Sequence, residues 1–373
     1  MAVAATALIW LLLFRGDNSS GGAAQGGGAS GAKPQVARVE SQLTLPQMVD
    51  QVMLVGFDGT KSQGDIETEL RSHQMGGVLV GPSNWPGAKA GAKLVGGLRA
   101  DGLAGSRVAP LIVAQQEGGS YRSFKDLPPV NTEFQIGTPG KPALVQQWAR
   151  EAAASLRAEG FDLDLFPVAD LTGPTSPVRD RGFSANPEAA AAFTAAAIRG
   201  CIEARMACAP SHFPGLGSAS QDTDEGPATV ATDTPGLLNN DILPFKAAFQ
   251  AKAPAVVMSL AFYAAYDPVT PGALSDAVAT GLLRNQLHYK GAAITDDLEA
   301  GAIRATESVP QAAVEAIAAG SDMVQVSAAK DVERVRQALM SAAQNGTIPQ
   351  QRLADAAARV LELKRQVGLL RGH

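Results

Sequence analysis

The sequence is poor in the residue types on which metal and nucleic acid sites depend. Of its 373 residues only two are cysteine and four are histidine. No group of His, Cys and Asp has the spacing of metal ligands, and no glycine-rich phosphate loop follows a strand, so neither a metal nor a nucleotide cofactor is expected. The net charge of -5 leaves no basic field to hold a phosphate backbone, which argues against nucleic acid as a partner.

The two cysteines carry little functional information. Cys201 falls in an expected helix and Cys208 in the strand that follows it. A disulfide between them is possible outside the cytosol but not required. Buried free thiols are the commoner state for cysteines beside apolar neighbours, and the sequence leaves open whether the two residues pair.

The amino-terminal region differs from the rest of the chain. Residues 2–14 form one unbroken apolar run, which is too short to cross a bilayer comfortably but has the length of a signal-peptide core. Residues 16–40 are rich in Gly, Ser and Ala, as in flexible linkers. We therefore expect a signal peptide or membrane anchor over 1–15, a tether over 16–40 and one domain over 41–373. The protein would be exported, either secreted or held at the membrane by this segment alone.

From about residue 44 short apolar runs alternate with longer amphipathic, Ala-rich stretches, a pattern typical of repeated strand and helix units. Eight strands are predicted, at 52–57, 76–81, 109–115, 163–169, 206–212, 255–261, 291–297 and 322–327. The clearest helical segments are 142–160, 187–204, 275–287 and 350–370. Eight strands with intervening helices favour an α/β fold, a single-domain (β/α)8 TIM-type barrel, over an open sheet.

Several predicted strands end in polar residues that a purely structural strand would not need. These are residues 115–117, Asp170, His212, Asp296 and Asp297. The carboxyl ends of barrel strands converge on one face, where residues distant in sequence meet in one pocket. We therefore expect the functional site on that face.

Seven stretches in order along the chain resemble glycoside hydrolase family 3, in particular its single-domain β-N-acetylhexosaminidases. They are QMVDQVMLVGF (47–57), GGVLVGPSN (76–84), APLIVAQQEGG (109–119), RAEGFDLDLFPVADL (157–171), RDRGFSANPEAAAAF (179–193), SHFPGLGSASQDTDEGP (211–227) and GALSDAVATGLLRNQLHYKGAAITDDLEAGAI (272–303). The resemblance implies a retaining glycosidase that acts on a glycan or amino sugar, with turnover of cell-wall glycan as one setting.

The resemblance places the catalytic groups. Asp296 matches the nucleophile, which must be a carboxylate because the oxocarbenium-like transition state needs negative charge beside the anomeric carbon. Asp297 should point away from Asp296 by strand alternation and play a supporting role. The family's acid and base is a loop histidine that an aspartate two residues earlier orients. Asp222 matches that aspartate, but Asp224 stands where the histidine should be.

Other positions also depart from the family pattern. Gln115 replaces a sugar-binding aspartate, Ser211 replaces a lysine, Leu216 replaces a second histidine and Ser120 replaces an arginine. Because charged contacts to hydroxyl groups are stronger than neutral ones, these losses should weaken recognition of the usual sugar.

The remaining substrate-binding candidates are Arg181 and His212, which match the family, together with Glu117. Two functional hypotheses follow. In the first, the chain is an active glycosidase in which Asp224 or Glu225 supplies the acid and base, with a pKa raised by apolar surroundings or by Asp222. In the second, it is a catalytically inactive barrel that binds a glycan or a protein partner.

Overall fold

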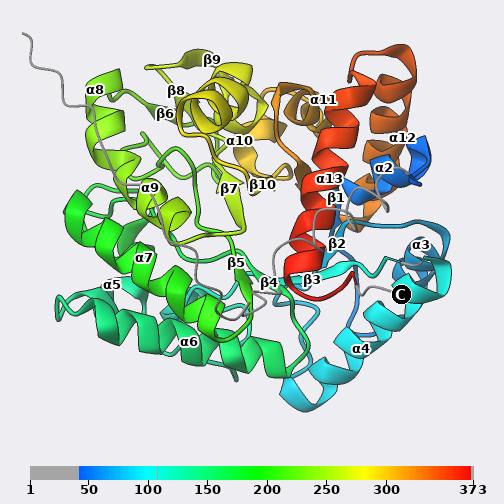
Figure 1. The fold of residues 1–373 in the computed structure, drawn as a ribbon, viewed down its shortest axis with the longest axis horizontal. Coiled ribbons are helices and arrows are strands. Elements are labelled where there is room, and N and C mark those ends of the chain that lie inside the picture. The colour runs from blue at the N-terminus through cyan, green and yellow to red at the C-terminus, as the bar shows by residue number, and fades with distance from the viewer. Residues whose placement is uncertain (1–41, 107, 371–373) are drawn as a thin grey trace, which may run out of the picture.

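A computed structural model describes residues 42–106 and 108–370, so the expected signal or anchor and the tether lie outside the described residues. Eight parallel strands form the central sheet in the order β5-β4-β3-β2-β1-β11-β10-β7 (Figure 1). The strands are β1 Met53–Val55, β2 Gly77–Leu79, β3 Leu111–Ala114, β4 Leu163–Asp164, β5 Ala207–Cys208, β7 Ala255–Met258, β10 Ala292–Asp297 and β11 Met323–Val326. Each of the eight strands predicted from sequence is present.

The sheet closes on itself between β5 and β7. The Val257 amide donates to the Pro210 carbonyl at 2.9 Å, and the Phe213 amide donates to the Val257 carbonyl at 2.8 Å. Phe213 and Met258 form a parallel bridge just beyond β5. The fold is therefore the predicted (β/α)8 barrel.

Helices surround the barrel, and α6 and α7 lie side by side along one flank (Figure 1). The α-helices are α2 Leu45–Gln51, α3 Asp65–Ser72, α4 Ala88–Gly105, α5 Glu133–Gly137, α6 Pro142–Ala158, α7 Pro187–Glu203, α8 Thr234–Gly236, α9 Leu243–Gln250, α10 Gly301–Arg304, α11 Val309–Ala319, α12 Ala329–Asn345 and α13 Gln350–Gln366. The segments η1 Gly119–Tyr121, η2 Arg179–Arg181 and η4 Gly272–Leu274 are 3-10 helices, and η3 Leu237–Asp241 and η5 Ala277–Gln286 are π-helices. The helix expected at 275–287 is thus a π-helix.

A small second sheet joins β6 Thr229–Val230, β8 Phe262–Tyr263 and β9 Asp267–Pro271. It lies beside the barrel, in segments that follow β5 and β7. None of the helices in the described ranges is both long and apolar enough to cross a bilayer.

Apolar side chains fill the barrel in the alternating pattern that strand geometry dictates. The interior cluster contains Leu54, Leu111, Val113, Leu163, Val257, Ile294 and Met323. Helix α13 adds Val360 and Leu363 to the same cluster, and Val367, just after the helix, joins them. These contacts place α13 over one end of the barrel, which seals the core there.

Cys201 and Cys208 form a disulfide, with their Cα atoms 6.2 Å apart. The sequence left open whether these residues pair, and the structure joins them. The last turn of α7 returns directly into β5, which brings the two Cα atoms within the range that a disulfide needs.

Lys364 of α13 is fully buried beneath the barrel. Its ammonium donates to the Gln51 Oε1 atom at 2.8 Å and to the Met75 carbonyl at 3.2 Å. Burial lowers the pKa of Lys364 to about 7, despite the favourable charge of Asp162. An amine whose pKa is lower in the folded than in the unfolded state binds fewer protons when folded, so stability rises with pH between the two values.

We therefore expect Lys364→Met to remove part of the pH dependence of stability. The free energy of unfolding of the native protein, minus that of the variant, should increase between pH 7.5 and 9.5, because only the native chain loses a proton on folding. Urea unfolding followed by circular dichroism at several pH values measures this difference. A difference that stays constant over this range would contradict a neutral buried amine.

Candidate active site

A cavity of about 140 Å³ opens at the carboxyl ends of the barrel strands. Its walls are mainly polar and come from six of the strands or the loops that follow them. The lining residues are Leu79, Gln115, Arg181, His212, Leu216, Asp222, Thr223, Asp224, Asp296, Asp297 and Gln325. The convergence expected from sequence therefore brings Gln115, Arg181, His212, Asp222, Asp224 and Asp296 together.

Asp296 stands at the end of β10 and faces the cavity, with 15% of its side chain exposed. The Asp297 amide donates to its Oδ1 atom at 2.9 Å. The Asp297 carboxylate accepts instead from the backbone amides of Glu299 and Ser327, each at 3.2 Å. Asp297 thus ties the β10 loop to the end of β11, and Asp296 is free to face a ligand.

His212 is held by Asp170, which is completely buried at the end of the β4 segment. The Nδ1 atom of His212 lies 2.7 Å from Asp170 Oδ2, and the His212 amide lies 3.2 Å from both carboxylate oxygens. The Leu216 amide also donates to Asp170, at 2.7 Å. Three donors on one carboxylate fix the loop after β5.

The imidazole of His212 is cationic at neutral pH. Burial alone would lower its pKa, but the charges of Asp170 and Asp296 outweigh burial and raise the pKa to about 9. The Nε2 atom lies 3.8 Å from Asp296 Oδ2, so the cation stands directly beside the strand-end carboxylate.

Arg181 and Glu117 form a bidentate ion pair beneath the cavity, with N–O distances of 2.7 and 2.8 Å. Burial alone would raise the pKa of Glu117, but the charge and hydrogen bonds of Arg181 outweigh burial and lower the pKa of this carboxyl group. Gln115 donates to Glu117 at 3.2 Å, and Asp222 Oδ2 lies 4.0 Å from the Arg181 guanidinium. Three of the predicted binding residues, Gln115, Glu117 and Arg181, therefore form one connected network, in which Glu117 holds the Arg181 guanidinium in place.

Asp224 projects from the loop after β5 into the same cavity. Loss of solvation raises its pKa, and repulsion by Asp296 and Asp222 adds to the effect, so that the pKa reaches about 6. The hydrogen bond between the two loop aspartates runs from the Asp224 amide to Asp222 Oδ1, at 3.0 Å. Asp224 is thus a carboxyl group able to hold or release a proton near neutral pH.

The loop that carries Asp224 is fastened to the segment just after β10. The amides of Gly301 and Ala302 donate to the carbonyls of Asp224 and Thr223 at 3.1 and 2.9 Å. A Cβ atom at position 301 would lie 2.7 Å from the Asp224 carbonyl oxygen, so only glycine permits this approach.

Some residues lie differently from the expectation or were missed. Ser211 is buried behind the cavity wall, and its hydroxyl has no hydrogen-bond partner among the described residues. Gln325, in β11, lines the cavity and has an unpaired, buried Oε1 atom. A polar residue within the apolar run of that strand was the available signal. Leu79 and Thr223 carried no such signal.

The described residues include one cluster with the spacing of a metal site. Ligand atoms of Glu69, His73 and Glu333 lie within 4.8 Å of one another. The three residues belong to the region of α3 and α12, and none of them lines the cavity.

We expect Asp170→Asn to lower the pKa of His212 by one unit or more, because the variant removes the nearest opposite charge while the imidazole stays buried. NMR titration of the imidazole nuclei of His212 measures the change. His288 is exposed on the surface, and its resonances serve as the internal reference in both proteins. An unchanged pKa of His212 would contradict the role given to Asp170.

Comparison with known protein families gives a match over almost the whole described chain. The family description "Glycosyl hydrolase family 3 N terminal domain" matches residues 41–363. The chain is 30% identical over 285 residues to a beta-hexosaminidase of Stenotrophomonas maltophilia, an alignment that covers 74% of this chain and 83% of the relative.

Two solved structures are also similar to the chain. A beta-N-acetylglucosaminidase of glycoside hydrolase family 3 from Paenibacillus superimposes with a TM-score of 0.86 at 29% identity, over 89% of this chain and 64% of that one. A beta-N-acetylhexosaminidase from Beutenbergia cavernae superimposes with a TM-score of 0.78, also at 29% identity, over 86% of this chain and 98% of that one. The chain therefore spans under two thirds of the Paenibacillus protein and nearly all of the Beutenbergia protein.

Proposed function

Because the chain belongs to glycosyl hydrolase family 3, we propose that it is a retaining β-N-acetylhexosaminidase with Asp296 as nucleophile and Asp224 as acid and base. The observation that carries the proposal is the pair of carboxyl groups on one cavity, one at a strand end and one with its pKa raised to about 6. Glycosidases need two carboxyl groups in different roles, and different surroundings are what separate those roles.

In the proposed reaction the Asp296 carboxylate attacks the anomeric carbon as the bond to the leaving oxygen breaks. Protonated Asp224 gives its proton to that oxygen. In the second step ionised Asp224 takes a proton from water, which attacks the same carbon and releases Asp296. The His212 cation, 3.8 Å from Asp296, and the Arg181 guanidinium supply fixed positive charge around the sugar.

The substrate is proposed from the relatives, whose names describe hydrolases of β-linked N-acetylhexosamines. Gln115 and Gln325 place amide groups on the cavity wall, and Gln325 keeps a free acceptor oxygen there. Such neutral groups suit the hydroxyl and acetamido groups of an uncharged amino sugar. The hypothesis of a catalytically inactive barrel gains no support, since the relatives carry hydrolase names and both carboxyl groups face the cavity.

We further propose that the enzyme acts outside the cytosol, on glycans of the cell wall, either secreted or held by its amino-terminal segment. The disulfide between Cys201 and Cys208 supports this proposal, because disulfides persist mainly in oxidising compartments. The apolar run over residues 2–14 supports it from the sequence.

Covalent trapping tests the nucleophile. We expect an activated 2-deoxy-2-fluoro glycoside to label Asp296, found by mass spectrometry of peptides, because the fluorine slows release of the glycosyl-enzyme more than its formation. Asp296→Asn should lose the label and at least about a thousandfold in kcat. Glu225→Gln, a change at an exposed loop carboxylate, should keep both label and activity. A label on another residue, or sugar binding without turnover, would sink the proposal.

The pH profile tests the acid. We expect kcat/KM of the native protein to fall as pH rises above about 6, because Asp224 must be protonated to act as the acid. Asp224→Asn should remove this descending limb and lower kcat/KM for a disaccharide by roughly a hundredfold or more, with a smaller loss for a nitrophenyl glycoside, whose leaving group needs little protonation. The same loss in Glu225→Gln and none in Asp224→Asn would assign the acid to Glu225 instead.

A further inference from the structure

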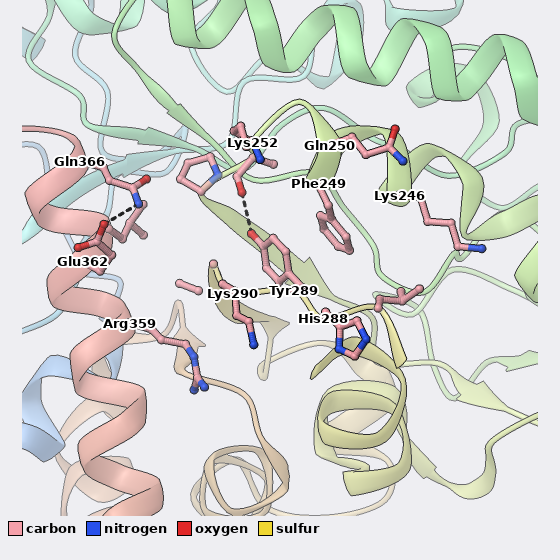
Figure 2. Close-up of a pocket in the computed structure, with 16 residues that line it drawn as sticks. Lys246, Phe249, Gln250, Lys252, His288, Tyr289, Lys290, Arg359, Glu362 and Gln366 are labelled. Atoms are coloured by element: carbon pink, nitrogen blue, oxygen red, sulfur yellow. Dashed lines mark hydrogen bonds between the residues drawn. The ribbon is translucent and has the colours of Figure 1, made fainter. Parts of the chain in front are cut away.

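A larger cavity, of about 740 Å³, lies on the opposite face of the barrel from the candidate active site. Its walls include residues 253 and 254, just before β7, and residues 291 and 292, at the start of β10. Asp296 is at the other end of β10. We call this cavity the basal groove, and α9 and α13 form its sides (Figure 2).

Positive charge is concentrated in the basal groove although the chain as a whole is acidic. Four cationic side chains line it, namely Lys246, Lys252, Lys290 and Arg359, together with His288. Glu362 is the one acidic residue on the lining, and Arg365 already pairs with it at 2.5 and 2.7 Å. The groove therefore presents an unbalanced positive field to solvent.

The buried charges behind the groove add to this field. Asp322 accepts hydrogen bonds from Arg284, Arg352 and Arg359, at 2.5, 2.7 and 3.0 Å. One carboxylate faces three guanidinium groups, so the cluster keeps an excess of positive charge. Burial lowers the pKa of Arg284; the charge of Asp322 opposes this change, and the charges of Arg359 and Arg352 add to it.

Two of the basic residues that line the basal groove have a backbone conformation that favours glycine. Lys252 follows the end of α9 and His288 follows the end of η5, with φ angles of 71° and 54°. Helices commonly end with glycine in this left-handed conformation. At both of these helix ends the chain instead has a basic side chain, and both side chains line the groove.

The floor of the groove is apolar and fixed. Phe249 and Tyr289 stack with ring centroids 4.0 Å apart, between Lys246 and Lys290 (Figure 2). The Tyr289 hydroxyl donates to the Ala253 carbonyl at 3.0 Å, and Arg284 donates to the carbonyls of Tyr289 and Gly291. These bonds hold the two loops together before any ligand arrives, which lowers the entropy cost of binding.

We propose that the basal groove binds an anionic polysaccharide, one that carries carboxylate or phosphate groups. The lysines and Arg359 would pair with the anionic groups, and the partly exposed ring of Phe249 would pack against the apolar face of a sugar. The concave shape suits a discrete chain better than a flat bilayer. The groove would hold the protein on a charged glycan while the opposite face stays open to substrate.

The test is binding of the folded protein to defined polymers, without any need for turnover, so that it stays separate from the test of catalysis. In affinity electrophoresis we expect gels containing polygalacturonate or phosphorylated dextran to retard the protein, and neutral dextran not to. Retardation by only one polymer identifies carboxylate or phosphate as the preferred group. Retardation should weaken as salt increases.

Matched variants locate the site. The double change Lys252→Gln with Lys290→Gln should raise the Kd for the retarding polymer about tenfold or more. The pair Lys89→Gln and Lys93→Gln, at exposed positions on α4, removes the same charge elsewhere and should leave the Kd unchanged. Phe249→Leu, which keeps all charges, should weaken binding to the polysaccharide.

Three results would overturn the proposal. They are equal retardation of the groove variant and the native protein, no retardation by any anionic polysaccharide, and equally tight binding of single-stranded DNA. The last result would make the groove a general polyanion surface. Thermal unfolding of each variant confirms that the fold is intact.

Discussion

The site depends on a single buried carboxylate, Asp170, more than on any of the groups that face the cavity. Asp170 lies beyond β4 and takes three donors from the segment after β5, including both the amide and the imidazole of His212. A buried carboxylate is costly unless its hydrogen bonds are satisfied, so this segment has little freedom to move. The position of His212, and through it the charge beside Asp296, follows from that constraint.

The barrel separates two electrostatic surfaces with an apolar core. At the carboxyl ends of the strands, aspartates outnumber the cations, and their repulsion adds to the loss of solvation that raises the pKa of Asp224. At the opposite ends, lysines and arginines dominate. Because the interior between them is filled by strand side chains and sealed by α13, each surface keeps its own charge balance. A chain that is only moderately acidic overall therefore has two faces of opposite charge.

The strands and the convergence of their polar ends could be predicted, because both follow from local periodicity and from barrel geometry. The ion pairs and hydrogen bonds between residues of the site could not be predicted in this way. Glu117 and Arg181 are 64 residues apart, and no local sequence pattern indicates that the two form an ion pair. The sequence left the disulfide open because cysteine spacing alone does not give the path of the chain after α7. Lys364 gave no signal either, since a lysine in an amphipathic helix is usually solvated.

Gly301 links the loop that carries Asp224, the proposed acid and base, to the segment that follows Asp296, the proposed nucleophile. Its amide donates to the carbonyl of Asp224, and it begins α10, five residues after Asp296. The separation of two catalytic carboxyl groups decides whether a glycosidase retains or inverts the configuration at the anomeric carbon. A side chain at position 301 would push the loop outward by the width of its Cβ atom. In the proposed mechanism, the separation of Asp224 and Asp296 thus depends in part on the absence of a side chain at position 301.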